Sequence, residues 1–132
     1  MIGWPELVET VAGIYTKLPP AERAHTAILT ANYGEMGAID LYGPAYGLPQ
    51  AITGINSGWE RGYGDPPPQT VIVLGYGLEN ASRIFKTCTV AGQVTNRFGV
   101  KNEETSAQPA ILVCREPRQP WPTLWPKLRH FG

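Results

Sequence analysis

The sequence predicts an α/β fold, a three-layer sandwich with a mostly parallel sheet of about five strands. Short apolar runs bounded by glycine and proline alternate along the chain with stretches of helical periodicity, which favours parallel strands with right-handed crossovers. The last two apolar runs have no helical stretch between them and predict an antiparallel hairpin. At 132 residues the chain is long enough for one hydrophobic core, so we expect a single domain over 1–132.

Helices are expected where apolar residues recur at three- and four-residue spacing. The clearest covers residues 5–18, with a proline suited to its first turn and Pro19 at its end. A second is expected over 34–42, stopped by Gly43 and the proline that follows. A third is expected over 79–86. Together they supply the crossovers that a parallel sheet needs.

Strands are expected at five short runs. The runs at 26–33, 50–54 and 70–76 are apolar and read as buried strands of a parallel sheet, with four consecutive aliphatic residues in the third. Residues 87–95 alternate in the manner of a strand, and 109–115 form the last run. These two are the predicted hairpin.

Residues 116–132 form a tail rich in tryptophan and proline, which we expect to pack on the domain. Its large apolar side chains recur at i, i+3, i+4 and i+7, the spacing of one helix face. The tail is predicted to cover the sheet edge of its own domain, and the alternative is a patch that docks on a partner or at a membrane interface, where tryptophan is enriched. The residues concerned are Trp121, Leu124, Trp125 and Leu128.

Composition excludes several classes of protein. Lysine and arginine number 11, aspartate and glutamate also 11, so the formal net charge is zero. A nucleic-acid binder normally shows a basic surplus, so no nucleic-acid partner is expected. Residues 1–5 lack the basic and apolar regions of a secretory signal. No stretch approaches the roughly 18 apolar residues of a membrane span.

The two cysteines, Cys88 and Cys114, are too few for a disulfide framework or a zinc site. They fall on the two strands of the predicted hairpin, so a single disulfide is possible if the strands are neighbours in a suitable register. Two buried free thiols are the alternative, and the residues alone leave both open. No cluster of histidine, cysteine and carboxylate has metal-ligand spacing, so neither a metal nor another cofactor is expected.

Polar and aromatic residues follow the first three predicted strands. The carboxyl ends of parallel strands meet at one edge of a sheet, where ligands of open α/β sheets bind. Aromatic rings stack on the apolar faces of sugars, and amides and carboxylates bond hydroxyls, so the set suits a sugar or another polyol. The alternative is that these residues make the strand-to-helix turns. The candidate ligand-binding residues are Asn32, Tyr33, Glu35, Asn56, Trp59 and Tyr76.

Two further patterns, one for nucleotide binding and one for catalysis, match only in part. Tyr76 lies between two glycines in a segment that superficially resembles a phosphate loop but lacks the third glycine. Glu35, Asp40 and Glu60 contain a possible carboxylate pair for glycoside hydrolysis, whose separation the sequence does not give. No catalytic residue is assigned.

Several segments, in order and over most of the chain, carry a resemblance to a known family. They are residues 32–40 (NYGEMGAID), Tyr42 with Gly43, Leu48 with Pro49, Asn56 and Ser57 with Trp59, residues 102–104 (NEE), 112–115 (LVCR) and 121–126 (WPTLWP). This order resembles the C-terminal soluble domain of bacterial integral-membrane glycosyltransferases. Those enzymes are of the dolichyl-phosphate-mannose–protein mannosyltransferase type and are related to the aminoarabinose transferase of lipid A. The segment after Ser57 departs from the pattern, since it lacks a further aromatic-rich stretch.

The resemblance implies a function and a location. Such enzymes carry their catalytic acids in a preceding bundle of membrane helices and use a polyprenyl-phosphate sugar as donor. The chain would then be an extracytoplasmic accessory domain, with Met1 at a domain boundary and its own membrane domain as partner. It would be non-catalytic in isolation and would position a glycan acceptor or the lipid-linked donor. A bridge between Cys88 and Cys114 would be chemically permissible there.

Two other functions compete with this interpretation. One is a stand-alone carbohydrate-active enzyme that acts on a glycoside through Glu35 and Glu60. The other is a protein-interaction module that uses Trp121 and Trp125 to hold a partner.

Overall fold

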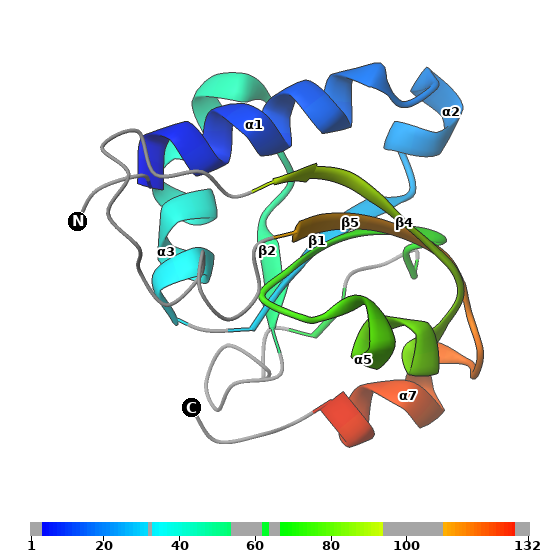
Figure 1. The fold of residues 1–132 in the computed structure, drawn as a ribbon. Helices are drawn as coiled ribbons and strands as arrows, with labels where there is room; N and C mark the ends of the chain where they lie inside the picture. The colour runs from blue at the N-terminus through cyan, green and yellow to red at the C-terminus, as the bar shows by residue number, and fades with distance from the viewer. Residues whose placement is uncertain (1–3, 32, 54–61, 64–66, 94–109, 129–132) are drawn as a thin grey trace.

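The computed structural model describes residues 4–31, 33–53, 62–63, 67–93 and 110–128. The elements follow the predicted alternation of helices and strands (Figure 1). In chain order they are α1 (Trp4–Lys17), α2 (Pro20–Arg23), β1 (Thr26–Thr30), α3 (Tyr33–Tyr42), the 3₁₀ helix η1 (Gly43–Tyr46), β2 (Ala51–Thr53), β3 (Thr70–Leu74), α5 (Leu78–Ile84), β4 (Phe85–Gln93), β5 (Ala110–Pro117) and α7 (Trp121–Leu128).

The five strands form one mixed sheet in the order β2-β1-β3-β5-β4. Strand β1 lies parallel to both β2 and β3, while β5 lies antiparallel to β3 and to β4. The predicted α/β class and the antiparallel pairing of the last two strands are therefore confirmed. Because β5 alone runs against the other four strands, its carboxyl end lies beside the amino end of β3, and Thr70 pairs with Arg115.

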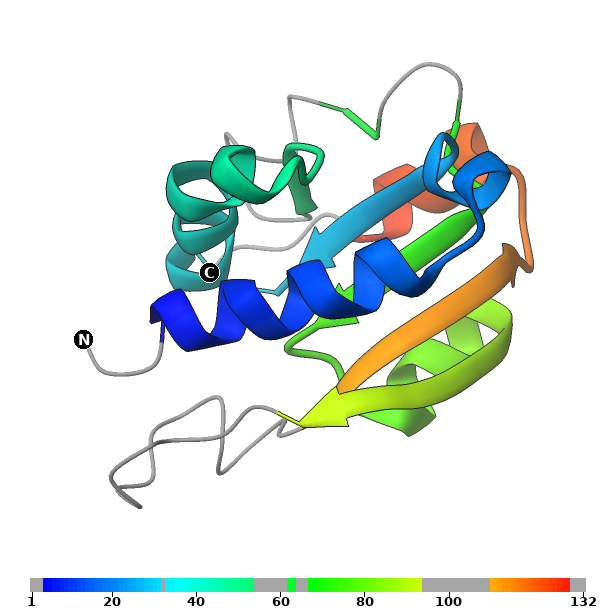
Figure 2. The same ribbon diagram turned by 90° about the horizontal axis from the view of Figure 1, so that it is seen from above.

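Helices cover both faces of the sheet, so the fold has three layers (Figures 1 and 2). Helices α1 and α3 pack on one face, against Ile28, Ile72 and Ile111 of the three central strands. On the opposite face, α5 and α7 pack against the residues that alternate with these, including Leu29 and Val73. The apolar runs are continuous because a strand covered on both faces buries successive side chains in two separate cores.

The first and third predicted strands end earlier in the structure than expected. Strand β1 ends at Thr30, because helix α3 already begins at Tyr33. Strand β3 ends at Leu74, because Gly75 takes a φ of 84°, in the left-handed region. The sequence analysis also missed α2 and η1. Both are short, and a proline in the first turn supplies the φ that starts each of them.

The tail contains helix α7, which lies across a face of the sheet. The expectation that the tail covers the sheet edge is wrong in this respect. Four large apolar side chains on one face of a helix need an apolar surface of similar area. The faces of β1 and β3 provide such a surface. The helix begins with Trp121, whose indole Nε1–H donates a 2.7 Å hydrogen bond to the Pro68 carbonyl. The buried residues are Trp121, Leu124, Trp125 and Leu128.

Most of residues 55–69 and all of residues 96–108, which connect predicted strands, lie outside the described residues. Within the part of the chain that the structure describes, no helix has both the length and the apolar character needed to cross a membrane.

Candidate functional site

The carboxyl ends of β2, β1 and β3 lie at one edge of the sheet, because these neighbouring strands are parallel. Two of the six predicted ligand-binding residues, Glu35 and Tyr76, are described there. Tyr33 is the first residue of α3, and its side chain lies outside the described part. The other three, Asn32, Asn56 and Trp59, also lie outside the described residues.

Glu35 is enclosed in the joint between β1 and α3. Its side chain is 1% exposed, and its Oε1 accepts a 3.0 Å hydrogen bond from the Ala31 backbone N–H. Gly75 passes directly over this carboxylate: a β-carbon at position 75 would lie 2.6 Å from Oε1 and 2.5 Å from the β-carbon of Ala31. A carboxylate in the first turn of α3 also interacts favourably with the helix dipole. Glu35 therefore joins the two strand ends.

Tyr76 is the other described member of the predicted site. Its pKa is raised to about 12, mainly by burial and secondly by the negative charge of Glu35. Its hydroxyl is buried and has no hydrogen-bond partner among the described residues. The sequence analysis expected Glu35 and Tyr76 at the same sheet edge, and in the structure the charge of Glu35 acts on Tyr76.

A cavity of about 570 Å³ opens beside Tyr76, between α5, α7 and the link that joins β5 to α7. We call it the α5–α7 groove. Its size is within the range of about 300 to 1,000 Å³ typical of small-molecule sites. The lining residues are Tyr76, Asn80, Arg83, Ile84, Arg118, Gln119, Leu124, Lys127 and Leu128.

Sequence reasoning missed every member of this groove except Tyr76, and the tail residues Leu124 and Leu128 were predicted to pack elsewhere. A signal was nevertheless present in the spacing. In α5 the lining residues follow i, i+3 and i+4 from Asn80, and in α7 they do so from Leu124. Such spacing marks one helix face. These two helix faces meet because of the strand order. Helix α5 leads into β4, and α7 follows β5.

A smaller cavity of about 390 Å³ lies beside α3 and η1 and is lined in part by Asp40. Asp40 Oδ1 accepts a 3.2 Å hydrogen bond from the Ala51 backbone N–H and so joins α3 to the start of β2. Of the three carboxylates considered for glycoside hydrolysis, Asp40 and Glu35 each hold a strand end, and Glu60 lies outside the described residues.

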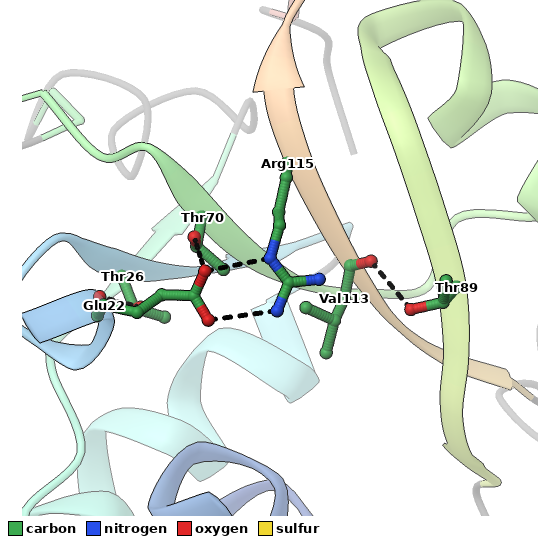
Figure 3. Close-up of polar contacts among 6 residues, drawn as sticks. All are labelled: Glu22, Thr26, Thr70, Thr89, Val113 and Arg115. Atoms are coloured by element: carbon green, nitrogen blue, oxygen red, sulfur yellow. Dashed lines mark hydrogen bonds and ion pairs between the residues drawn. The ribbon is translucent and has the colours of Figure 1, made fainter. Parts of the chain in front are cut away.

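The opposite end of the sheet carries an ion pair (Figure 3). Both oxygens of Glu22, from α2, accept bonds from Arg115 of β5, Oε2 from Nε at 2.9 Å and Oε1 from Nη2 at 3.0 Å. Thr70 Oγ1 donates to Glu22 Oε2 at 3.1 Å. The hydrogen bond to Arg115 is the main cause that lowers the pKa of Glu22. This cluster connects α2, β3 and β5, and it lies at the edge opposite to the predicted ligand site.

Cys88 and Cys114 form a disulfide in the structure. They are directly opposite in the ladder between β4 and β5, so the bridge crosses the hairpin. Within the described ranges, no group of three histidine, cysteine or carboxylate side chains is arranged to hold a metal ion.

No family model, curated protein or solved structure matches this chain. Function is therefore inferred from the sequence resemblance, the disulfide and the chemistry of the strand edge and the groove.

Proposed function

We propose that this chain is an extracytoplasmic accessory domain of an integral-membrane glycosyltransferase that uses a lipid-linked sugar donor. The class comes from the resemblance carried by residues 32–40 and by the segments that follow it in order. In this proposal the membrane domain of the same protein carries the catalytic residues. The described chain helps to position the acceptor or the donor and is non-catalytic alone.

The structural observation that carries the proposal is the Cys88–Cys114 disulfide. Disulfides form and persist in oxidising compartments and are rare in the reducing cytosol of mesophiles. A bridge across adjacent strands therefore supports a location on the extracytoplasmic side, where the resembled domains lie. The α/β sandwich supports the same proposal more weakly, because many functions share this fold.

The two competing functions receive less support from the described residues. Glu35 is enclosed by Ala31 and Gly75, and this enclosure gives no opening for a sugar on its carboxylate. Trp121 and Trp125 are buried against the sheet, so neither presents an exposed patch to a partner. We therefore give Glu35 a positioning role and the tryptophans a structural one.

The test uses the complete gene that encodes this chain, expressed in its source cells with an epitope tag after residue 132. The tagged protein is expected to sediment with membranes and to lose its tag when spheroplasts are treated with external protease. A maleimide that adds mass to free thiols should modify Cys88 and Cys114 only after reduction. A tagged protein found in the cytosol with both thiols free would overturn the proposal.

Activity provides a second measurement. Membranes that contain the complete protein are expected to transfer sugar from a polyprenyl-phosphate donor, whereas the isolated 132-residue chain should transfer none. Cleavage of glycosides by the isolated chain, lost in Glu35→Gln, would instead favour the stand-alone enzyme. A Glu79→Gln variant, at an exposed position of α5, serves as the control.

A further inference from the structure

The α5–α7 groove combines two kinds of surface, aliphatic and cationic. Its interior includes aliphatic side chains, Ile84 from α5 and Leu124 and Leu128 from α7. Around these lie three cationic side chains from three segments, and the lining contains no carboxylate. Since the whole chain has a formal net charge of zero, the positive charge of this groove is a local concentration. The cations are Arg83, Arg118 and Lys127.

The three cations differ in how far the protein already neutralises them. Arg83 pairs with Glu79 at 3.2 Å, in an exposed contact one helical turn apart. Arg118 Nε donates to the Ser82 carbonyl at 2.9 Å, and Lys127 Nζ donates to Gln119 Oε1 at 3.1 Å. Both of these acceptors are uncharged, and no carboxylate of the described chain pairs with either cation. A guanidinium has five N–H donors and an ammonium three, so each retains donors for a ligand.

These bonds also hold the two cations in place. The bond from Arg118 to Ser82 fixes the guanidinium beside the end of α5, and the Arg118 backbone N–H donates to the Ile84 carbonyl at 2.9 Å. The bond from Lys127 to Gln119 joins α7 to the link that precedes it. Figure 1 shows that α5 and α7 lie together on the same side of the sheet. The positive charges are therefore positioned before any ligand binds, which lowers the entropy cost of binding.

We propose that the α5–α7 groove binds a phosphate ester that carries an aliphatic chain. Its phosphate lies against Arg118 and Lys127 with Arg83 nearby, and its chain packs on Ile84, Leu124 and Leu128. A phosphate monoester offers three acceptor oxygens and nearly two negative charges at neutral pH, which matches three cationic donors better than a carboxylate does. The chemistry of the groove carries this inference. Only the identity of the lipid that is bound in the cell rests on the proposed function.

The shared chemistry has two sources, an isoprenyl phosphate and a glycerolipid phosphate, which binding measurements distinguish. The 132-residue chain is titrated with geranyl monophosphate and, separately, with dihexanoyl phosphatidic acid below its micelle concentration. We expect a dissociation constant below about 1 mM for at least one of them. Inorganic phosphate, geraniol and decanoate are each expected to bind at least about tenfold more weakly, because each lacks part of the required chemistry.

Charge-removing variants locate the site. Lys127→Gln and Arg118→Gln should each weaken binding of the better probe about tenfold, the typical loss for one charge-assisted hydrogen bond. Lys86→Gln removes the same charge from an exposed position of β4 outside the groove and should leave binding unchanged. Thermal unfolding of every variant is measured. Lys127→Gln is the decisive variant, because its bond joins residues only eight apart, whereas the Arg118 bond ties the link after β5 to α5. Binding should also weaken as salt rises from about 50 to about 300 mM.

The possible outcomes separate this inference from the proposed function. Three outcomes overturn the groove assignment and leave the localisation test untouched. They are equal binding of geraniol or decanoate, equal loss of binding in Lys86→Gln, and no binding of either lipid phosphate. Specific binding of phosphatidic acid in preference to geranyl monophosphate supports the groove as a site for a bilayer lipid. Specific binding by a chain whose complete protein proves cytosolic retains the groove and overturns the glycosyltransferase proposal.

Discussion

At each end of the sheet a glutamate connects neighbouring elements, but the contacts that hold the two glutamates differ. At the carboxyl ends of β1 and β3, Glu35 is enclosed, bonded to a backbone N–H and pressed against Gly75. At the amino ends, Glu22 keeps 23% of its side chain exposed and is held by the side chains of Arg115 and Thr70.

This difference determines what each end responds to. The carboxyl end depends on close packing, so substitutions that add a single carbon should disturb it strongly. The amino end depends on an ion pair and, one residue along β5 from Arg115, on the disulfide at Cys114. Bonds of those kinds respond to acid, salt and reductant. Five experiments test this comparison.

The largest expected effect is reduction of the Cys88–Cys114 disulfide near the amino end. The cysteines are 26 residues apart, and for a loop of that length the chain-entropy model gives a loss of about 3.5 kcal/mol in the free energy of unfolding. Urea denaturation with and without a phosphine reductant measures it. The variant Cys88→Ala/Cys114→Ala should show no response to reductant. Identical midpoints for oxidised and reduced native chains would show that the bridge contributes nothing.

At the carboxyl end, the substitution Gly75→Ala should cost about 3 kcal/mol. Alanine is strained at a φ of 84°, and its β-carbon would overlap Ala31 and the Glu35 carboxylate. Gly37→Ala is the matched control, because position 37 lies inside α3 with open space around it. That control should raise stability by about 1 kcal/mol through helix propensity. If both variants unfold at the same urea concentration, close packing around Gly75 does not stabilise the carboxyl end of the sheet.

Next in size is an alkaline effect at Tyr76. Its pKa is about 12 in the folded chain against 10.0 ordinarily, so between these values the unfolded chain releases the proton first. Stability from this group is complete below pH 10 and is lost as the pH rises through 12, by about 2–3 kcal/mol. Tyr76→Phe should remove that part of the alkaline loss, while Tyr46→Phe, at an exposed site, should not. Stability is followed by urea denaturation at each pH.

The contribution of Glu35 to this shift can be measured separately. Its charge is the second cause of the raised pKa, after burial, so Glu35→Gln should lower the pKa of Tyr76 without returning it to 10. Phenolate absorbance, compared with that of the same variant carrying Tyr76→Phe, isolates this one tyrosine. An unchanged pKa would mean that the two side chains are electrostatically independent.

Local patterns predicted the parts of the fold that depend on neighbours in sequence. Periodicity gave α1 to within one residue at each end, and the aliphatic run gave β3. The boundary at Gly75 was missed because the strand ends where it meets Ala31 and Glu35, which are some forty residues earlier in the chain. Contacts between distant segments leave no local pattern of this kind.

The candidate site shows the same division. Glu35 and Tyr76 could be predicted because carboxyl ends of parallel strands must share an edge. Arg83, Arg118 and Lys127 could not, because each is an ordinary surface cation in its own segment. They meet because β5 lies between β3 and β4, which brings the helix before β4 beside the helix after β5. No rule of local sequence fixes that strand order.

The smallest expected effect is at the amino end, where Glu22→Gln should cost about 1 kcal/mol at pH 7, the upper range for a partly exposed ion pair. The pKa of Glu22 is lowered in the folded chain, so its contribution is present above the ordinary value of 4.5 and is lost as pH falls through the folded value. The variant should therefore match the native chain in strong acid and fall below it near neutrality. Glu79→Gln breaks a pair with a similar 3.2 Å contact but 84% exposure, and should cost at most about 0.5 kcal/mol. Equal losses in the two variants would mean that partial burial and the second bond from Thr70 add nothing to the ion pair at the amino end.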